Sequence, residues 1–435
     1  MPTLEKIVSF CKRRGFIYPG SEIYGGLANT YDYGPLGVEL KNNIKQAWWK
    51  YFVQDREDMV GLDGGLLMNP KVWEASGHVE KFKDSLVECK KCHKRFRPDK
   101  LNDISKCPEC GGGLTEEKFF SGMFKTVIGP VEKEGLTTYL RPETAQNIFV
   151  NYKNVLDSTN VKIPFGIGQI GKAFRNEITT GTFIFRTLEF EQMEIEYFIS
   201  PSANWKKIFQ DWADYMRGFM DVIGLDKRKL HNREIGEAER AFYSKRTIDM
   251  DYEFPFGKDE LWAIAYRTDY DLSNHQKMSG QNLEYFDEQE NKKYIPHVIE
   301  PTFGVDRILL AILCGAYKEE KLENGENRTV LKLHHSIAPY KAAVFPLLRN
   351  KPELVKKARK VYEELKGEFM VDFDDHGNIG KRYRRQDEVG TPFTITCDFD
   401  SLKQDDVTVR DRDTIKQKRV KIGELIGYLK EKLHA

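Results

Sequence analysis

Apolar side chains recur at helical spacing in two long segments of this chain. In residues 37–56 the apolar positions are Val38, Ile44, Ala47, Trp48, Tyr51 and Phe52. In residues 201–224 they are Trp205, Ile208, Phe209, Trp212, Met216 and Phe219. Such stripes are typical of amphipathic helices whose apolar side packs on a core. The pattern therefore predicts a helix in each segment, and by itself it carries no chemistry.

Residues 174–198 have a different pattern, rich in aromatic and β-branched residues on both sides of Thr179, Thr180 and Gly181. This pattern predicts two strands joined by a turn. Because side chains alternate between the faces of a strand, one face of the second strand should carry Met193, Ile195, Tyr197 and Ile199. The other face should carry Arg186, Phe190, Gln192, Glu194 and Glu196.

The polar face of this second strand favours a binding site. Arg175 and Glu177 lie two apart on the first strand and are expected to point the same way. Arginine binds phosphate and an aromatic ring stacks on a base, so Arg175 beside Phe190 suits a nucleotide. Arg307 stands at the head of the apolar segment 308–317, where it would cover the other side of the base. The alternative is a set of buried ion pairs, which would be costly to bury.

The C-terminal hundred residues form a separate pattern. The charged run within residues 318–335 breaks the apolar periodicity and suggests a surface excursion or linker. After it, segments typical of strands and helices alternate, at 341–348, 352–367, 369–375, 391–400 and 422–433. This alternation predicts a small α/β domain. We therefore expect one domain over residues 1–335 and a second over 336–435.

Composition limits the class of protein. The chain has 435 residues, 40% of them hydrophobic and 12% aromatic, which predicts a folded protein of two or three domains. Its formal net charge of +1 implies no strong global field, so any surface that binds nucleic acid must be local. The first sixteen residues lack an apolar stretch typical of a signal peptide, and we see no run long enough to span a membrane. We expect a cytoplasmic protein.

Four cysteines form two pairs of the CxxC type. Fourteen residues separate the pair Cys89 and Cys92 from the pair Cys107 and Cys110. In a reducing compartment this spacing predicts a Zn²⁺ site, and four thiolates make it structural. Two disulfides are the alternative, and His93 is expected to be a bystander. The pairs would lie in an insertion at about residues 86–118.

Longer strings add a resemblance. FRNE (174–177) and EPTFGVDR (300–307) resemble motifs 2 and 3 of class II aminoacyl-tRNA synthetases, and the region of Pro70 resembles motif 1. The strings RPETAQNIFV (141–150), GKAFRNEI (171–178), LEFEQMEIEYF (188–198), AYRTDYDL (265–272) and residues 379–400 resemble glycyl-tRNA synthetases of the homodimeric type. The likeness spans nearly the whole chain. It implies an α+β fold: an antiparallel-sheet catalytic domain with a zinc-knuckle insertion, followed by an α/β anticodon-binding domain.

The resemblance implies roles for the nucleotide residues. Arg175 would contact the α-phosphate of ATP and Glu177 the adenine amino group, and Phe190 and Arg307 would enclose the base. Arg186 would hold the outer phosphates, and Mg²⁺ would bridge them with help from Glu260 and other carboxylates. Arg175 and Arg307 would be catalytic. The remaining residues of the expected ATP site are Asn176, Phe185, Thr187, Leu188, Glu189, Leu261, Gly304, Val305 and Asp306.

The resemblance also implies glycine as substrate, with transfer to the 3′ end of tRNA(Gly). Glu143, Glu194 and Glu300 match the family's positions for the ammonium group, and Arg97 would reach in from the insertion. Arg267 would be a cationic partner either of the substrate carboxylate or of the site's own carboxylates. Larger amino acids would clash, so no editing is needed. The other residues of the expected glycine site are Phe190, Glu191, Gln192, Met193, Pro301, Thr302, Phe303 and Gly304. Glu143 could instead cap a helix, and we expect His78 to be structural.

The chain departs from the family pattern at motif 2. Thr302 replaces a common serine, TTGTF (179–183) replaces a more usual Pro-Arg turn, and Leu188 replaces an expected arginine. Because that turn usually meets the acceptor end of tRNA, the tRNA contacts there are in question. In the C-terminal domain, Lys381, Arg382, Arg384 and Arg385 would contact the anticodon, unless this cluster is merely a solvated face. Motif 1 and the helix at 37–56 imply a homodimer.

Two other functions fit part of the pattern. A second class II synthetase of the same subgroup, for threonine, proline or serine, is disfavoured by the expected carboxylate-rich pocket and by the string at 379–400. A synthetase-like accessory protein that binds nucleic acid without catalysis would tend to lose the motif arginines. Arg175 and Arg307 are both present, which disfavours that reading.

Overall fold

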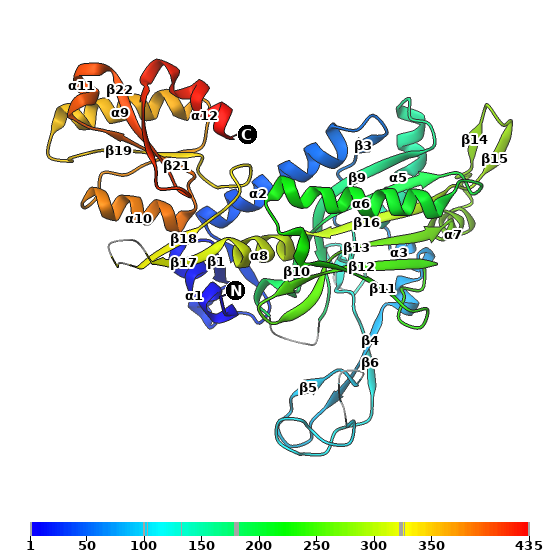
Figure 1. Cartoon of the computed structure of the whole chain (residues 1–435). Coiled ribbons are helices and arrows are strands. Elements are labelled where there is room, and N and C mark those ends of the chain that lie inside the picture. Colours follow the sequence, from blue (N-terminus) through cyan, green and yellow to red (C-terminus); the bar gives the residue numbers. More distant parts are fainter. Residues whose placement is uncertain are drawn as a thin grey trace.

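The computed structural model describes residues 2–433 apart from 99–100, 102, 132, 178–181, 322–324 and 326. Its centre is a seven-stranded sheet that confirms the predicted antiparallel α+β fold (Figure 1). The strands in spatial order are β11 (Leu230–Glu234), β12 (Arg246–Phe254), β13 (Gly257–Thr268), β16 (His297–Gly304), β10 (Glu189–Ile199), β9 (Phe165–Phe174) and β3 (Met59–Gly61). Only β3 and β9 pair in parallel within this sheet.

One face of this sheet packs on the main hydrophobic core. Four helices contribute to that core: α1 (Leu4–Arg14), α2 (Pro35–Trp49), α6 (Trp205–Ile223) and α8 (Val305–Ala316). They meet the apolar residues of β10 that the alternation predicted, of which Met193 and Ile195 are fully buried. The opposite face is split. One part of it packs on α5 (Ala145–Ser158) through a smaller core around Phe165 and Phe198. The other part is polar.

The two predicted amphipathic helices are confirmed, with changed ends. The segment predicted at 37–56 begins at Pro35, whose fixed φ suits a first helical position, and it passes into a π-helical turn at Lys50–Gln54. Its buried stripe runs through Leu36, Leu40, Ile44 and Trp48, and the predicted member Val38 is exposed instead. The second helix, α6, begins after Asn204, whose side chain accepts a hydrogen bond from the Lys207 N–H, and it ends at Gly224.

The predicted hairpin at 174–198 is only partly right. The strands β9 and β10 do pair, from Glu189 opposite Phe174 to Phe198 opposite Phe165. However, β9 ends at Phe174 and β10 begins at Glu189, so Arg175, Glu177 and Arg186 lie outside the strands. The predicted turn at Thr179–Gly181 lies outside the described residues. Strand periodicity could not locate these ends, because the alternation of side chains does not show where pairing with the neighbouring strand stops.

The C-terminal residues form a second sheet with its own core, as predicted. The strands in spatial order are β20 (Val371–Phe373), β19 (Ala342–Pro346), β21 (Phe393–Cys397), β22 (Asp406–Asp411) and β23 (Gln417–Lys421). Helices α9 (Pro352–Lys366) and α12 (Leu425–Leu433) contribute to this core. Two further helices, α10 (Ile379–Val389) and α11 (Phe399–Gln404), were not predicted. The pattern missed α10 because its buried residues are polar: Arg382, Gln386 and Asp387.

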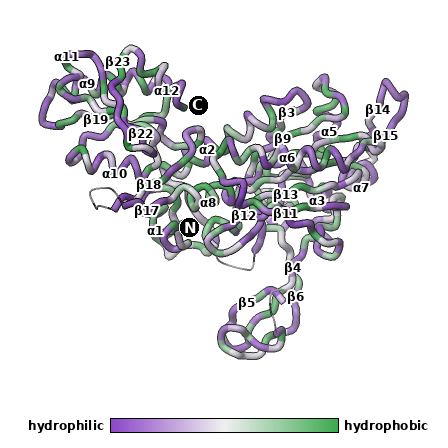
Figure 2. Tube along the Cα trace, in the orientation of Figure 1, coloured by the Kyte–Doolittle hydropathy of each residue, from purple (hydrophilic) through white to green (hydrophobic). Residues whose placement is uncertain are grey.

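Shorter elements complete the chain. The insertion forms a lobe that projects from the seven-stranded sheet on β4 (Lys83–Glu88) and β6 (Lys118–Ser121), with β5 (Arg95–Phe96) beside them (Figure 1). The hairpin of β14 (Tyr285–Asp287) and β15 (Lys292–Tyr294) extends from the far end and is predominantly hydrophilic (Figure 2). No helix among the described residues has an apolar stretch long enough to cross a bilayer.

The segment predicted as a surface excursion or linker at 318–335 joins the two domains through buried charges. It contains most of a hairpin, β17 (Tyr317–Lys321) with β18 (Asn327–Leu331). Arg328 on β18 is buried, and its Nε donates to Asp387 Oδ2 on α10 at 2.8 Å. Arg410 on β22 donates to the same carboxylate at 2.9 and 3.2 Å. Asp387 thus lies between two buried guanidinium groups, so this segment is part of a packed joint.

We predict that Asp387→Ala destabilises the protein by about 3–5 kcal/mol, because it leaves Arg328 and Arg410 buried without their shared carboxylate. Urea unfolding followed by circular dichroism would measure this change. The matched control is Glu363→Ala, which truncates an exposed carboxylate on α9 of the same domain. A loss no larger in Asp387→Ala than in the control would contradict the proposed importance of this joint.

Candidate active site

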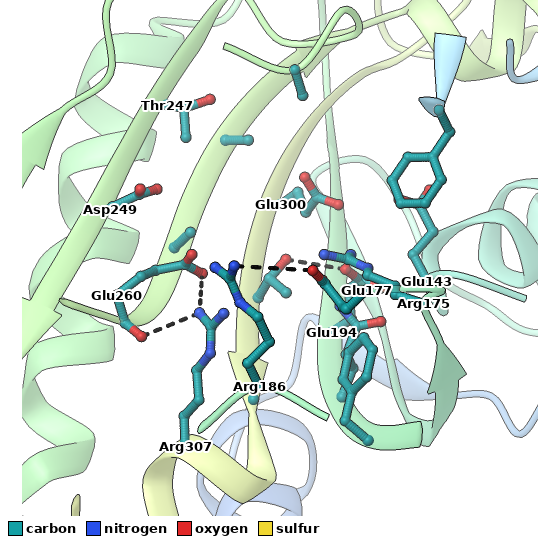
Figure 3. A pocket seen from close by; sticks show the side chains of 18 of the residues that line it. Glu143, Arg175, Glu177, Arg186, Glu194, Thr247, Asp249, Glu260, Glu300 and Arg307 are labelled. Atoms are coloured by element: carbon teal, nitrogen blue, oxygen red, sulfur yellow. Dashed lines mark hydrogen bonds and ion pairs between the residues drawn. The ribbon is translucent and has the colours of Figure 1, made fainter. Parts of the chain in front are cut away.

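A pocket of about 970 Å³ lies over the polar part of the seven-stranded sheet. It collects most of the residues that the sequence suggested for ATP and glycine (Figure 3). The predicted residues that line it are Arg97, Glu143, Arg175, Glu177, Phe185, Arg186, Thr187, Phe190, Gln192, Glu194, Glu260, Glu300, Thr302, Gly304, Asp306 and Arg307. They come from strands β10, β13 and β16, the start of α8, the loop before α5, the segment between β9 and β10, and the insertion.

Arginines and aromatic rings gather at one end of the pocket. Arg307, on the first turn of α8, pairs with Glu260 Oε1 at 2.9 Å and lies over the ring of Phe185 at 4.6 Å. Arg175 lies 5.3 Å from the ring of Phe190, and its Nε donates to the Pro142 carbonyl at 3.0 Å. These contacts orient both guanidinium groups before any ligand binds.

Figure 3 shows Arg186 extending between Glu177 and Arg307. Its Nη1 lies 4.0 Å from Glu177 Oε2, so these two charges are paired at the limit of an ion pair. Asp249 and Glu260 face the same end of the pocket from β12 and β13. Burial, reinforced by Glu260, raises the pKa of Asp249 to about 7. A cation bound there would relieve this repulsion between carboxylates.

Carboxylates gather at the other end. Glu194 Oε2 accepts hydrogen bonds from the Thr144 N–H at 3.0 Å and the Thr144 hydroxyl at 2.5 Å. The Thr302 hydroxyl donates to Glu194 Oε1 at 3.1 Å. Glu143 accepts from Gln146 at 3.0 Å. The side chains of Glu143, Glu194 and Glu300 are all nearly inaccessible to solvent, so this end is a buried cavity rich in carboxyl groups.

Arg267 lies beneath these carboxylates and does not line the pocket. Its Nη1 donates to Glu300 at 2.6 Å, and its Nε and Nη2 donate to Asp271 at 2.7 and 2.9 Å. Its Nη2 is 3.6 Å from Glu143. The guanidinium group stacks 3.7 Å from the ring of Tyr243 and is fully buried. Arg267 is therefore a partner of the site's carboxylates, one of the two roles expected for it.

The carboxylates respond differently to this environment. Burial alone would raise the pKa of Glu143, but His78 and Arg267 hold it below its ordinary value. Burial raises the pKa of Glu194, and the neighbouring Glu143 adds to the effect. Burial also raises the pKa of Glu300 well above its ordinary value, although Arg267 opposes the shift. This end of the pocket therefore holds more carboxyl groups than buried positive charge can balance.

Several functional neighbours escaped the sequence analysis. His78, expected to be structural, lies in the pocket wall with Nε2 3.3 Å from Glu143 and Nδ1 2.8 Å from the Ser76 hydroxyl. It therefore orients a residue of the site. Asp271 belongs to the quoted string AYRTDYDL, so that string contained a signal for it. Tyr243 and Asp249 follow no pattern that could have found them.

The side chains of the other predicted residues lie outside the pocket. In the ATP set these are Asn176, Leu188, Glu189, Leu261 and Val305, and in the glycine set they are Glu191, Met193, Pro301 and Phe303. Strand alternation is the main reason. Met193 and Phe303 are fully buried in the core on the opposite face of the sheet, and Glu191 pairs there with Lys41 and Lys45 at 3.1 Å each.

The four cysteines of the insertion come together. All four Sγ atoms lie within 4.8 Å of one another, with Cys89 and Cys110 at 3.5 Å and Cys92 and Cys107 at 3.7 Å. A disulfide would need about 2.0 Å, and sulfur atoms around a tetrahedral Zn²⁺ lie roughly 3.8 Å apart, given Zn–S bonds of about 2.3 Å. N–H groups of Cys92 and Lys91 donate to Cys89 Sγ and lower the pKa of that thiol to about 6. The donor set fits a structural zinc site.

Two neighbours of the cysteines have separate roles. His93 is exposed and approaches Glu88 at 3.4 Å, so it stands apart from the thiol cluster. Arg97 lies 3.8 Å from Asp84 and lines the pocket over the seven-stranded sheet. The insertion therefore supplies one cationic side chain to that pocket.

The basic cluster on α10 is less available than its sequence suggested. Arg382 is 1% exposed, and its guanidinium group donates to the carbonyl groups of Pro346, Asp375 and Gly377. This burial corrects the expectation that Arg382 contacts nucleic acid, because the group is used to hold the loops around α10. Arg385 pairs with Asp374 at 2.6 Å and Arg384 donates to the Asn327 carbonyl at 2.5 Å, whereas Lys381 is exposed.

Comparisons with known proteins agree with this architecture. Residues 128–315 match the model of the tRNA synthetase class II core domain (G, H, P, S and T), and residues 341–432 match the anticodon binding domain. The chain is 52% identical to the glycine–tRNA ligase of Lachnospira eligens, with 99% of each chain covered. It is also 52% identical to that of Geobacillus thermodenitrificans (99% of this chain, 98% of the relative) and 50% identical to one from Bacillus cereus, over the whole of both chains. The chain therefore belongs to the glycine–tRNA ligase family of class II aminoacyl-tRNA synthetases.

Proposed function

We propose that the pocket activates glycine with ATP and that the glycyl group then passes to the 3′ end of tRNA(Gly). The observation that carries this proposal is one continuous cavity with two chemically distinct ends. Arginines and aromatic rings suit a nucleotide at one end, and a confined group of carboxylates suits a small ammonium at the other. The reacting atoms, the glycine carboxylate and the α-phosphate of ATP, would meet between them.

The first step is attack by a glycine carboxylate oxygen on the α-phosphorus, with pyrophosphate leaving. This step needs charge placement more than a protein nucleophile. Arg175 is proposed to stabilise the charge that develops on the α-phosphate, since its guanidinium group is already fixed by the Pro142 carbonyl. Phe190 and Arg307 would enclose the adenine, Glu177 would accept from its amino group, and Arg186 would bind the outer phosphates.

The remaining predicted ATP residues would act from the edges of this end. Thr187, Gly304, Asp306 and Phe185 line the pocket, and Asp306 also binds the Glu191 N–H at 2.9 Å and so ties α8 to β10. A Mg²⁺ ion bound with ATP would neutralise phosphate charge during pyrophosphate departure. Glu260 and Asp249 would hold it, because hard carboxylate oxygens are the ligands that Mg²⁺ prefers.

Glycine selection is proposed to depend on space and charge at the carboxylate end. Glu143, Glu194 and Glu300 would surround the ammonium group. The small side chains of Ala263 and Ala265 line the same cavity. The Thr302 methyl group occupies space that a serine would leave open, while its hydroxyl is held by Glu194. A substrate with a larger side chain would collide with these walls.

Amino-acid-dependent ATP–pyrophosphate exchange tests this function. With glycine, alanine, serine, threonine and proline assayed in parallel, we expect exchange with glycine and at least about 10²-fold less with the others, because a fixed cavity excludes larger side chains by steric clash. Exchange with threonine, proline or serine instead would indicate another synthetase of the same subgroup. No exchange with any of them, from folded protein, would favour the accessory-protein alternative.

The variant Arg175→Ala isolates the proposed catalytic charge. We expect glycine-dependent exchange to fall by at least about 10²-fold, as for loss of a group that stabilises transition-state charge, while tRNA binding stays nearly unchanged. The matched control is Arg228→Ala, an exposed arginine paired with Asp226 far along the chain. Equal loss of exchange and tRNA binding would show that Arg175 has a structural role.

The anticodon proposal concerns the second sheet. We propose that residues 1–335 form the catalytic domain and that residues 336–435 form the domain that binds the anticodon. This second domain would contact the RNA backbone and stack unpaired anticodon bases on aromatic side chains. Lys381 is the exposed member of the basic cluster, and Arg384 and Arg385 lie at the surface of α10 with protein partners already in place. Arg382 is not part of this proposed surface, because it is buried.

We further propose a homodimer in a reducing, cytoplasmic setting. Large apolar side chains near the N-terminus are strongly exposed, including Ile23 at 89% and Tyr24 at 87%, and they would suit contact with a second copy. All seven cysteines are free thiols, as such a compartment would keep them.

The zinc proposal predicts about one Zn²⁺ per chain by elemental analysis. Cys107→Ser should remove most of this metal, because it deletes one of the four thiolate ligands. Cys397→Ala serves as the control, since Cys397 is a buried thiol in the other domain. Zinc content that is unaffected by Cys107→Ser, or absent from folded wild-type protein, would contradict the proposed site.

A further inference from the structure

Glu196 lies beneath the carboxylate end of the pocket and has no evident role in the proposed reaction. It is fully buried and does not line the pocket. Neither of its carboxyl oxygens accepts a hydrogen bond from a donor among the residues that the structure describes. An isolated carboxylate in such a place would be very costly. The position therefore requires an explanation.

The sheet register places Glu196 against a residue of the site. On β10 and β16, Glu194 is opposite Thr302 and Tyr197 is opposite Ile299. The same register sets Glu196 opposite Glu300, and the carboxyl oxygens of Glu194, Glu196 and Glu300 lie within 4.8 Å of one another. Two like charges directly across adjacent strands repel each other, and burial strengthens that repulsion.

The neighbouring carboxyl groups all have donors. Glu194 accepts from Thr144 and Thr302, and Glu300 accepts from Arg267. Asp271 accepts two hydrogen bonds from Arg267 and one from Gln146. Such donors favour the ionised form of a carboxyl group and so oppose the effect of burial. Within the described part of this cluster, Glu196 is the carboxyl group that lacks such a donor.

The balance of charge in this cluster also indicates that Glu196 carries a proton. The charged and titratable groups around Glu196 are Glu194 on its own strand, Glu300 on β16, Arg267 on β13, Asp271 on α7 (Tyr270–Ser279) and, beyond them, Glu143, His78 and His275. The guanidinium group of Arg267 cannot balance so many carboxylates. Burial first, and then Glu300, raise the pKa of Glu196 well above its ordinary value. A proton held at this position reduces the negative charge of the cluster by one.

We propose that Glu196 is a positioning residue: it stays a neutral carboxylic acid and donates its proton in a hydrogen bond to Glu300. The two carboxyl groups then carry one negative charge between them, which belongs to Glu300. The Glu300 carboxylate then accepts one hydrogen bond from Arg267 and one from Glu196, and these two bonds fix its orientation toward the pocket. This proposal rests on the proposed function, in which Glu300 binds the ammonium group of glycine.

The arrangement matters for binding a small cation. If both groups were ionised, their repulsion would separate β10 from β16 and admit protons or cations other than substrate. If Glu300 carried the proton instead, it would present a hydroxyl to the ammonium and lose the attraction. A proton fixed on the deeper residue avoids both outcomes, because the acid lies where substrate does not reach.

Two substitutions of Glu196 separate shape from charge and hydrogen bonding. Glu196→Gln keeps the shape, stays neutral and can donate to Glu300 from its amide. Glu196→Leu is neutral and fills similar space but cannot donate. We expect the KM for glycine to stay within about threefold of wild type in Glu196→Gln and to rise at least about tenfold in Glu196→Leu, with the KM for ATP unchanged in both. Glycine-dependent pyrophosphate exchange measures these constants.

Infrared spectroscopy detects the proton itself, without an activity assay. The C=O stretch of a buried carboxylic acid should be present in wild-type protein at neutral pH and should be lost in Glu196→Gln. Glu253→Gln makes the same chemical change at a partly exposed position on β12 of the same sheet and should retain the band. If Glu196→Leu does not fold, the wild-type spectrum and Glu196→Gln still decide the matter.

Several results would overturn the proposal. A KM for glycine as high in Glu196→Gln as in Glu196→Leu would mean that an ionised Glu196 is needed. Wild-type KM in both variants would mean that Glu196 positions nothing, and a band that persists in Glu196→Gln would place the proton elsewhere. Failure of the proposed function looks different: wild-type protein would then show no exchange with glycine, while the infrared band would still report the proton.

Discussion

The fully buried guanidinium group of Arg267 is the interaction on which the site depends. It holds Asp271 and Glu300 directly and approaches Glu143, while the ring of Tyr243 covers it. Burying this many carboxyl groups would be prohibitive without it, since removal of one partner from a buried ion pair costs about 3–5 kcal/mol. The excess of carboxyl groups over buried positive charge then makes the cavity receptive to a small ammonium ion.

A strand with two different faces makes this site possible. On one side of β10, Met193 and Ile195 pack into the core with α2 and α6. On the other side, Glu194 and Glu196 lie among polar groups. Because the apolar face fixes the strand in position, the polar face can hold groups that would otherwise repel one another. Core packing and the chemistry of the pocket are thus two results of one alternation.

The separate lobes are joined to this centre by specific contacts. The insertion is built around four cysteines and reaches the pocket with Arg97. The C-terminal domain is fixed by Asp387 between Arg328 and Arg410, and by an ion pair between Arg14 and Glu388. Such pairs depend on geometry, so they set one orientation of the domains where apolar packing alone would allow several. A tRNA that contacts both domains would meet a surface of defined shape.

Sequence alone determined the features that depend on near neighbours. Helical spacing identified α2 and α6, alternation identified the two faces of β10, and cysteine spacing identified the thiol cluster. The long strings around Arg175, Glu194 and Arg307 identified the family. All of these signals are periodicities or short motifs, which the chain carries whatever its final packing.

The tertiary structure decided which polar side chains are buried and which partners they have. It placed Arg382 inside the protein, moved Arg175 and Arg186 outside the strands, and left Glu196 without a donor opposite Glu300. These outcomes depend on contacts between segments far apart in sequence. The free energy of a buried charge is set by the groups that surround it in space, and a local pattern carries no information about them.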